Sequence, residues 1–536
     1  MFIKKHLKGL QIFLITQAII ISVQSSCFAV DSGIQGTESP SDTSGQIFGY
    51  QGAIGQNVNP SERIFTDDEE KSGPIEITLE NGIFMMLENN RSLMVEGMKP
   101  LISETYEAEK TAVFDPVLSG SAEYSTERGS KGNKESDVNV RVDVSKYLPT
   151  GTELRAGLQK KRSWSDLYNN TYDSRIGLTI TQALLSGKGM QVNMANIRQA
   201  KLNTQITEYE FRGFAQTMVA QAEETYWDYA LALKRIEIFS ESLELAERQH
   251  EETEELIAVG MLPEKEITAA KAEISFRRQG LIDARSNLEK IHLRFIRLLN
   301  PQGDNPWDRE IILKDLPSVL LPDIKMDNVQ EYVELALRFR PEVNRARLGL
   351  QRNELEIVKT RNGLLPKMDF FIDLGRSGYA SSFGRSFKDL DGDHYDYNVG
   401  LEFRYEFGNR KSKATNRRAI LVQDQAQESL ENLQDLIEMD IRQAYIEINR
   451  SKEQISATME TLKLQEEKLE IEREKFKVGK STMLNVAQGQ RDLLLARINE
   501  IQAKANYIKS LLELYRLDGS LLDRRGISAP GSEPVS

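Results

Sequence analysis

The chain has 536 residues, 28% of them charged, and a formal net charge of −12 at pH 7. Such an acidic protein is a poor partner for nucleic acid, because the phosphate backbone repels it. Aromatic residues make up only 7% of the chain and there are only 15 prolines, a composition that favours long solvated helices over thick cores.

The N-terminus has the order of a secretory signal peptide. Three lysines precede an apolar run at 10–23, and Cys27-Phe28-Ala29 supplies a small-residue cleavage site. We predict cleavage after Ala29, which removes the only cysteine and leaves a fold without disulfides. Two alternatives stay open: a lipoprotein acylated at Cys27, and an uncleaved anchor, although a spanning helix needs ~20 apolar residues.

The rest of the chain follows one plan twice. LENNRSL at 87–93 and LRFRPEV at 337–343 lie 250 residues apart, and the turns LIAVG at 256–260 and KFKVG at 475–479 lie 219 apart. Constant offsets indicate internal repeats. The predicted organisation is a signal peptide at 1–29, a flexible segment at 30–74, a first repeat at 75–300 with strands at about 117–181, an inter-repeat segment at 301–328, a second repeat at 329–520 with strands at about 368–407, and a flexible tail at 521–536.

Each half is predicted as a helix, strands, a long helix, a turn and a helix. The long helices, 190–259 and 409–478, would each span ~105 Å. Along the second, apolar residues recur every seven positions, which is a coiled-coil seam: Ile441, Ile448, Ile455, Leu462, Leu469 and Phe476. The predicted shorter helices are 83–113, 263–300, 329–362 and 482–518. Two of them placed end to end match one long helix.

The predicted strands alternate apolar and polar residues. In DVNVRVDV at 137–144 every second residue is valine, and 398–407 alternates in the same way. Such segments fit strands of a transmembrane barrel with an aqueous lumen, and a soluble sandwich would alternate similarly. Export and the absence of an obvious second sheet favour the membrane. Six candidate strands are too few to enclose a lumen, so the barrel must be shared between chains.

The doubled plan, the two Val-Gly turns, LENNRSL and TQALLSGKG at 181–189 together resemble the TolC-like outer-membrane efflux proteins, also called outer membrane factors. The resemblance covers about 75–520. It implies a mixed fold, in which a homotrimer forms one β-barrel in the outer membrane and one long coiled-coil α-helical barrel across the periplasm. The family pattern is four strands per protomer and twelve per trimer. The extra candidates at 137–160 therefore either add strands to the barrel or form a projecting hairpin.

The resemblance also implies the function: a passive exit duct of a tripartite efflux or type I secretion system, in the outer membrane and extending into the periplasm. Its implied partners are a periplasmic adaptor protein, an inner-membrane pump and outer-membrane lipid, with no nucleic acid. No catalytic residues, cofactor or metal are expected, because neither a nucleophile–base set nor a zinc spacing stands out. The alternatives are a periplasmic adaptor, which the constant 219-residue offset opposes, and an anchored structural coiled-coil protein.

Two groups of candidate site residues follow from the same resemblance. Counting back from the second turn places Glu467 and Glu470 at the level of the family's acidic constriction, which implies a gate or selectivity ring. A charged run is also typical of a solvated helix face. The turns Val259-Gly260 and Val478-Gly479 correspond to the family's adaptor contacts, although glycine is also the usual end of a helix.

Overall fold

The computed structural model describes residues 49–50, 73–128, 134–165, 170–303, 305–314 and 328–535. The predicted signal peptide, with Cys27, and nearly all of the predicted flexible segment at 30–74 lie outside the described residues. No helix within the described ranges is both long and apolar enough to cross a membrane.

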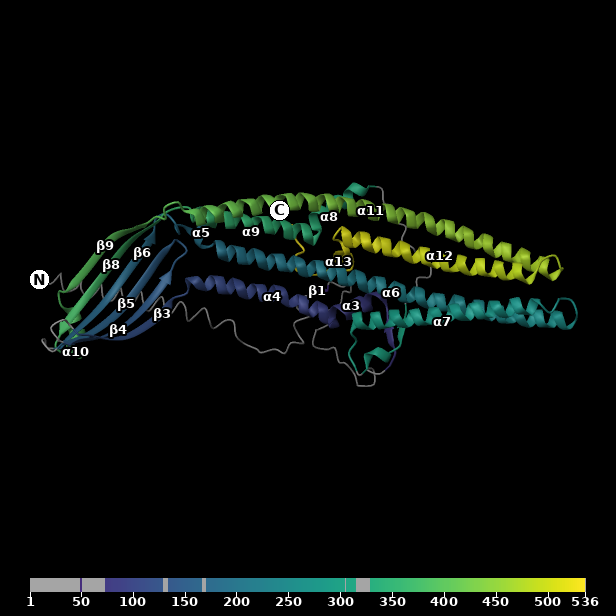
Figure 1. Cartoon of the computed structure of the whole chain (residues 1–536), viewed down its shortest axis with the longest axis horizontal. Coiled ribbons are helices and arrows are strands. Elements are labelled where there is room, and N and C mark those ends of the chain that lie inside the picture. The colour runs from purple at the N-terminus through teal and green to yellow at the C-terminus, as the bar shows by residue number, and fades with distance from the viewer. Residues whose placement is uncertain are drawn as a thin grey trace, which may run out of the picture. The chain divides into compact units, whose positions relative to one another are not determined.

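One antiparallel sheet contains six strands, in the order β3-β4-β5-β6-β8-β9 (Figure 1). Its edges are therefore β3 and β9. The strands are β3 Val117–Arg128, β4 Lys134–Tyr147, β5 Thr152–Ser165, β6 Thr171–Ala183, β8 Lys367–Ala380 and β9 Tyr395–Arg404.

The additional hairpin of the first half is part of this sheet. Strand β4 pairs with β3 from Lys134 to Ser145, and β5 pairs with β6 from Thr152 to Ser163. The alternative of a hairpin that projects from the sheet is therefore wrong for this chain. Regular alternation already predicted these two strands, but only the register shows which neighbours they take.

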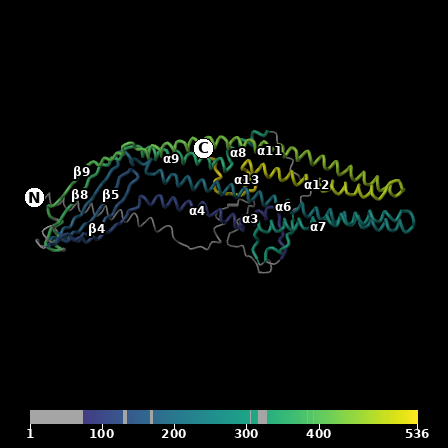
Figure 2. Tube along the Cα trace, in the orientation of Figure 1, coloured from purple at the N-terminus to yellow at the C-terminus, as the bar shows by residue number. Residues whose placement is uncertain are grey.

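Two long helices follow the strands, as predicted. Helix α6 spans Ala195–Ala258 after the short α5 at Met190–Asn193, and α11 spans Arg410–Lys477. Each turns back into a shorter helix, α7 at Glu266–Leu299 and α12 at Met483–Leu517 (Figure 2). Helix α6 packs on α7 and α11 on α12, and the two hairpins also touch, through α6 and α12.

The helix that precedes the strands is divided in both halves, where a single helix was predicted. The first half has α3 at Leu79–Asn89 and α4 at Arg91–Thr111, continued by the 3₁₀ turn Ala112–Phe114. Asn90 separates α3 from α4, and its side chain accepts hydrogen bonds from the backbone of α4. The second half has α8 at Val329–Phe339 and α9 at Pro341–Asn362. Pro341 disfavours helical backbone at Arg340, so the chain breaks there.

The seven-residue seam of α11 is confirmed. Ile441, Ile448, Ile455 and Leu469 are buried, and Leu462 and Phe476 are half-buried. Ile441, Ile448 and Ile455 of the seam belong to a hydrophobic core shared with α8, α9 and α12. The buried residues that these three helices contribute include Val333, Ala336, Val343, Tyr507, Leu511 and Leu514. A regular apolar stripe is buried because the partner helix presents its own stripe.

The residues after Leu521 are packed against the rest of the chain, where a flexible tail was predicted. Helix α13, Leu521–Arg524, buries both leucines completely, and Ile527 is 4% exposed. Strand β10, Ile527–Ser528, pairs with β1, Gly49–Tyr50. Glycine, serine and acidic residues suggested mobility, but the segment is anchored by residues of α6 that lie about 300 positions earlier.

Remaining short elements lie beside the helices. Strands β2, Ile75–Ile77, and β7, Ile311–Leu313, pair in parallel, and the 3₁₀ turn Pro306–Asp308 precedes β7. Helix α10, Phe383–Lys388, and the 3₁₀ turn Asp389–Asp391 connect β8 to β9. The predicted inter-repeat segment at 301–328 is thus partly ordered, and 315–327 falls outside the described residues.

Candidate functional site

The two predicted adaptor-contact turns have the same backbone structure. Gly260 has φ +76° and Gly479 has φ +71°, the left-handed region in which glycine is favoured. In the first turn the N–H of Gly260 donates to the carbonyl of Ile257, and the N–H of Met261 donates to the carbonyl of Leu256. The second turn repeats both bonds: Gly479 to Phe476 and Lys480 to Lys475. This pair of bonds is a Schellman motif, which satisfies the last carbonyls of a helix.

The tips of these turns are exposed and apolar. Val259 is 69% exposed, Met261 71% and Val478 66%. A Cβ atom built on either turn glycine would meet nothing within 4 Å. The glycines are therefore needed for their backbone angle alone, and the neighbouring valines are free to contact another protein.

Near the second turn, Glu467 and Glu470 differ from three neighbouring acids of α11. Three of their neighbours are paired: Glu466 with Arg497 at 3.8 Å, Glu472 with Lys475 at 2.7 Å and Glu474 with Lys477. Glu467 and Glu470 are exposed, and within the described part of the chain neither forms an ion pair. They lie three residues apart on one helix face.

A buried group of charges lies between α7 and α12, and the sequence did not indicate it. Glu273 is 3% exposed and Arg277, one turn later on α7, is fully buried; their side chains approach to 2.5 Å. Arg491 of α12 donates to the second oxygen of Glu273 at 2.9 Å. Burial lowers the pKa of Arg277, against the opposing effect of Glu273. From the sequence, a run of charged residues in a helix is expected to face solvent. The structure shows that α12 packs over Glu273 and buries it.

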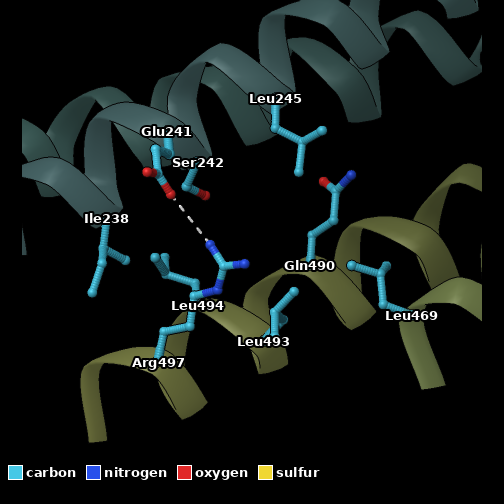
Figure 3. Close-up of a pocket in the computed structure, with 9 residues that line it drawn as sticks. All are labelled: Ile238, Glu241, Ser242, Leu245, Leu469, Gln490, Leu493, Leu494 and Arg497. Carbon is cyan, nitrogen blue, oxygen red and sulfur yellow. Dashed lines mark hydrogen bonds and ion pairs between the residues drawn. The ribbon is translucent and has the colours of Figure 1, made fainter. Parts of the chain in front are cut away.

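A small cavity between the two hairpins lies near the same level of the helices. Its volume is about 50 Å³, and Figure 3 shows its lining from both sides: Ile238, Glu241, Ser242 and Leu245 of α6, Leu469 of α11, and Gln490, Leu493, Leu494 and Arg497 of α12. Arg497 donates across it to Glu241 at 3.3 Å. The cavity is large enough for a water molecule but too small for a substrate, so it is not a binding pocket. The residues around it form part of the contact between the two hairpins.

One face of the sheet is an exposed apolar surface. Val140, Val142 and Val144 of β4 are 42–45% exposed, and Leu374 of β8 is 47% exposed. The same face carries further exposed side chains on other strands: Leu118, Tyr124, Ile176, Leu178, Tyr397, Val399, Leu401 and Phe403. Lys160, Arg162 and Arg376 also lie on this face. A mainly apolar surface of this kind marks contact with a protein partner or with lipid.

The opposite face of the sheet is charged, and its charges pair across strands. Arg175 of β6 donates to Asp373 of β8 at 2.8 Å and to Asp396 of β9 at 2.6 Å. Gly375 lies beside this group, where a Cβ atom would approach Asp396 and Arg175 to 2.5 and 2.6 Å. Alternation placed these side chains on a polar face, but their pairing depends on a register between residues about 200 positions apart.

Within the described residues, no three His, Cys, Asp or Glu side chains are grouped so as to hold a metal ion. The acid-rich segment 389–398 contains the 3₁₀ turn Asp389–Asp391 and the first residues of β9, and its turn lies against the end of β8. There Asp389 accepts from the backbone N–H of Tyr379 at 2.9 Å, and Arg376 donates to the carbonyl of Gly392.

A profile of the outer membrane efflux protein family matches residues 106–300 and 332–520, which together make up more than half of the chain. No curated protein sequence matches it.

Several solved structures share the fold. A CusC structure, described in terms of folding and transmembrane channel formation, aligns with a TM-score of 0.62 at 17% identity, covering 91% of this chain and 99% of that one. The CmeC outer membrane channel of Campylobacter jejuni aligns at 0.62 and 16%, covering 83% and 86%. The open MtrE outer membrane channel of Neisseria gonorrhoeae aligns at 0.59 and 16%, covering 83% and 89%.

Proposed function

This chain belongs to the outer membrane efflux protein family, and we propose that it is the exit duct of a tripartite export assembly. The protein is a passive channel of the outer membrane that extends into the periplasm, and it is not an enzyme. One observation of this structure carries the proposal: the sheet at one end of the long helices has one exposed apolar face and one charged face. Lipid on one side and water on the other would satisfy both faces.

We further propose a homotrimer. A single sheet leaves the backbone of β3 and β9 unpaired, and hydrocarbon does not tolerate unpaired N–H and C=O groups. Copies of the chain can satisfy one another by pairing these edges into a closed barrel. The long helices α6 and α11, with α7 and α12, would form the wall of a coiled-coil helical barrel in the periplasm.

The gate of this duct is proposed to be the ring formed by Glu467 and Glu470. Both carboxylates are exposed and form no ion pair in the described structure, although the charge of Glu470 acts on Lys477 from a greater distance, whereas adjacent acids are paired with lysine or arginine. Three copies would bring six unpaired carboxylates together. Such a ring favours cations and binds multivalent cations most strongly.

The turns Val259-Gly260 and Val478-Gly479 are proposed to contact a periplasmic adaptor, which would link the duct to an inner-membrane pump of an efflux or type I secretion system. The exposed valines support this assignment, because an apolar tip held by a rigid Schellman turn is a pre-organised contact.

Single-channel recording of the detergent-purified protein in a planar bilayer tests the function. We expect discrete, cation-preferring conductance steps and a complex of three chains in detergent. The absence of both conductance and a trimer would overturn the duct in favour of an anchored coiled-coil protein.

A further inference from the structure

The hairpin β4–β5 is built into the sheet as fully as the other strands. Strand β4 is paired with β3 from Lys134 to Ser145 and with β5 from Glu135 to Tyr147, and β5 is also paired with β6. Without the hairpin, β3 would have no hydrogen-bonded neighbour in this sheet. The hairpin is therefore an integral part of the sheet, which has six strands in one chain.

The division into an apolar and a polar face crosses all six strands along one row of paired residues, whereas Lys160, Arg162 and Arg376 interrupt the apolar face in neighbouring rows. Successive paired residues on the apolar face form one row that crosses the whole sheet: Leu118, Val144, Ala156, Leu178, Leu374 and Tyr397. On the charged face the hairpin adds its own cross-strand pairs, Arg141 with Gln159 at 3.0 Å and Lys161 with Asp137 at 3.4 Å. A strand outside the barrel wall would have no reason to keep this division.

The two edge strands of the sheet, β3 and β9, can pair between copies of the chain. Every residue of β3 is exposed, as is all of β9 except Gly400. Strand β3 leaves the end of helix α4, whereas β9 leads back to helix α11. They run in opposite directions, as an even number of antiparallel strands requires, so β9 of one copy can pair antiparallel with β3 of the next.

From these observations, and resting on the proposed outer-membrane duct, we propose that three copies close an eighteen-stranded barrel through β9–β3 pairing. Strands lie ~4.8 Å apart and tilt by ~40° in such barrels, so each occupies about 6 Å of the perimeter. Eighteen strands give a backbone diameter of about 36 Å, against about 24 Å for the twelve strands of the family pattern.

A barrel of this width allows larger molecules to pass through the outer membrane than a twelve-stranded barrel does. Barrels of sixteen to eighteen strands leave a water-filled lumen, and here the lumen wall carries Arg141, Lys161 and Arg175, which pair with Asp143, Asp137 and Asp373. The outer-membrane part of the duct then accepts bulky polar cargo, and size selection is left to the periplasmic entrance.

Engineered disulfides test the edge pairing. Tyr397→Cys on β9 is combined in turn with Leu118→Cys, Ala122→Cys or Tyr124→Cys on β3, all on the apolar face. A disulfide forms only where the Cα atoms lie within about 7 Å. We expect at least one combination to give covalent dimers and trimers after mild oxidation of outer membranes, and the unaltered chain, whose only cysteine is Cys27, to give none.

Matched variants make the result specific. Tyr397→Cys with Leu374→Cys should cross-link within one chain, because these residues are paired neighbours. Tyr397→Cys with Ser121→Cys or Glu123→Cys should not cross-link, because these β3 residues lie on the opposite face. Efficient intermolecular cross-linking to Leu158→Cys of β5 instead would remove β3 and β4 from the wall and overturn the proposal.

End-on electron microscopy of the detergent-purified complex decides the number of strands, because a twelve-stranded barrel that leaves out the β4–β5 hairpin would form the same β9–β3 disulfides. A trimer with eighteen strands in its wall supports the inference. A trimer with twelve strands overturns it while leaving the exit duct intact, whereas a complex without a barrel would remove both.

Discussion

At the scale of single residues, the structure distinguishes charges that face solvent from charges that hold elements together. Both kinds occur on the same helices and are indistinguishable in the sequence. Glu467 and Glu470 are unpaired and exposed, whereas Glu273 is buried beside two arginines. The first pair is therefore exposed to solvent, as the proposed gate requires, and the second group contributes to helix packing.

Replacing Glu467 and Glu470 together with glutamine should lower the preference for cations over anions by about fivefold. This corresponds to ~1 kcal/mol, the energy of one charge pair at 4 Å in water. Block by multivalent cations should weaken in parallel. Reversal potentials in planar bilayers measure the change. Glu466→Gln with Glu474→Gln is the control, because both acids are paired; an equal loss in the control would remove the gate assignment.

Removing Glu273 should be strongly destabilising. Glu273→Ala leaves Arg277 buried without its counter-charge, which costs about 3–5 kcal/mol. The thermal unfolding midpoint of the detergent-solubilised protein should fall accordingly. The double variant Glu273→Leu with Arg277→Met replaces the buried charges by apolar side chains and should recover most of the stability. No recovery would mean that the ion pair itself stabilises the contact of α7 with α12.

Asp518 gives a prediction of pH dependence. Its side chain is fully buried, one carboxylate oxygen accepts from Ser520 N–H, and the other has no hydrogen-bond partner among the described residues. Burial raises the pKa of Asp518 above its ordinary value of 3.8. The protonated form is thus favoured in the folded state, and the charged form reduces stability at every pH above the raised pKa.

Asp518→Asn should therefore stabilise the protein at neutral pH, because it removes the buried charge and keeps the size of the side chain. The gain should shrink as the pH falls through the raised pKa and vanish near pH 4. Unfolding midpoints measured between pH 4 and 8 check it. A gain that is constant with pH would show that the ionisation of Asp518 is not its cause.

At the scale of elements, the two turns depend on a backbone angle rather than on space. Proline fixes φ near −65°, so it cannot occupy position 479, where φ is +71°. Gly479→Pro should distort the tip and reduce pump-dependent export to the level of cells lacking the protein, while insertion and conductance are retained. Export of a fluorescent substrate from cells measures this, with Lys480→Ala as the matched control. Normal export in Gly479→Pro would discount the adaptor contact.

The division of the short helices is also decided at this scale. Asn90 and Pro341 interrupt helices that the apolar pattern alone joins into one. Both breaks have ordinary local causes, an N-cap and a proline. The sequence contained both signals. The prediction of single helices gave more weight to the apolar pattern than to these helix-interrupting residues.

At the scale of the whole molecule, the C-terminal segment anchors the second half of the chain to helix α6. Buried Glu223 accepts two hydrogen bonds from Arg525, and buried Arg212 donates to Asp523 and to the carbonyl of Ala529. Ending the chain after Gly526 removes β10 and the buried Ile527, whose burial alone is worth about 1.5–3 kcal/mol.

This truncation should lower the unfolding midpoint by several degrees, whereas removal of Ser536 alone should leave it unchanged. Differential scanning fluorimetry in detergent gives both values. An unchanged midpoint after the longer truncation would restore the sequence-based expectation of a dispensable tail.

By itself the sequence determined the features that depend on local periodicity. It placed the two long helices and their turns to within a few residues, because heptads and helix-ending glycines act over one or two turns. It also placed the alternating strands, including the extra pair, and it carried the family resemblance that the comparisons confirm. The roles of Glu467, Glu470 and the turn residues rest on that resemblance and stay predictions.

Only the tertiary structure decided which distant residues meet. The pairing of Arg175 with Asp373 and Asp396, the burial of Glu273 by α12, and the packing of the C-terminal segment on α6 all join residues about 200–300 positions apart. Periodicity assigns each side chain to a face but not to a neighbour. The neighbour depends on strand register and helix packing, because those alone decide whether a charge is solvated, paired or buried.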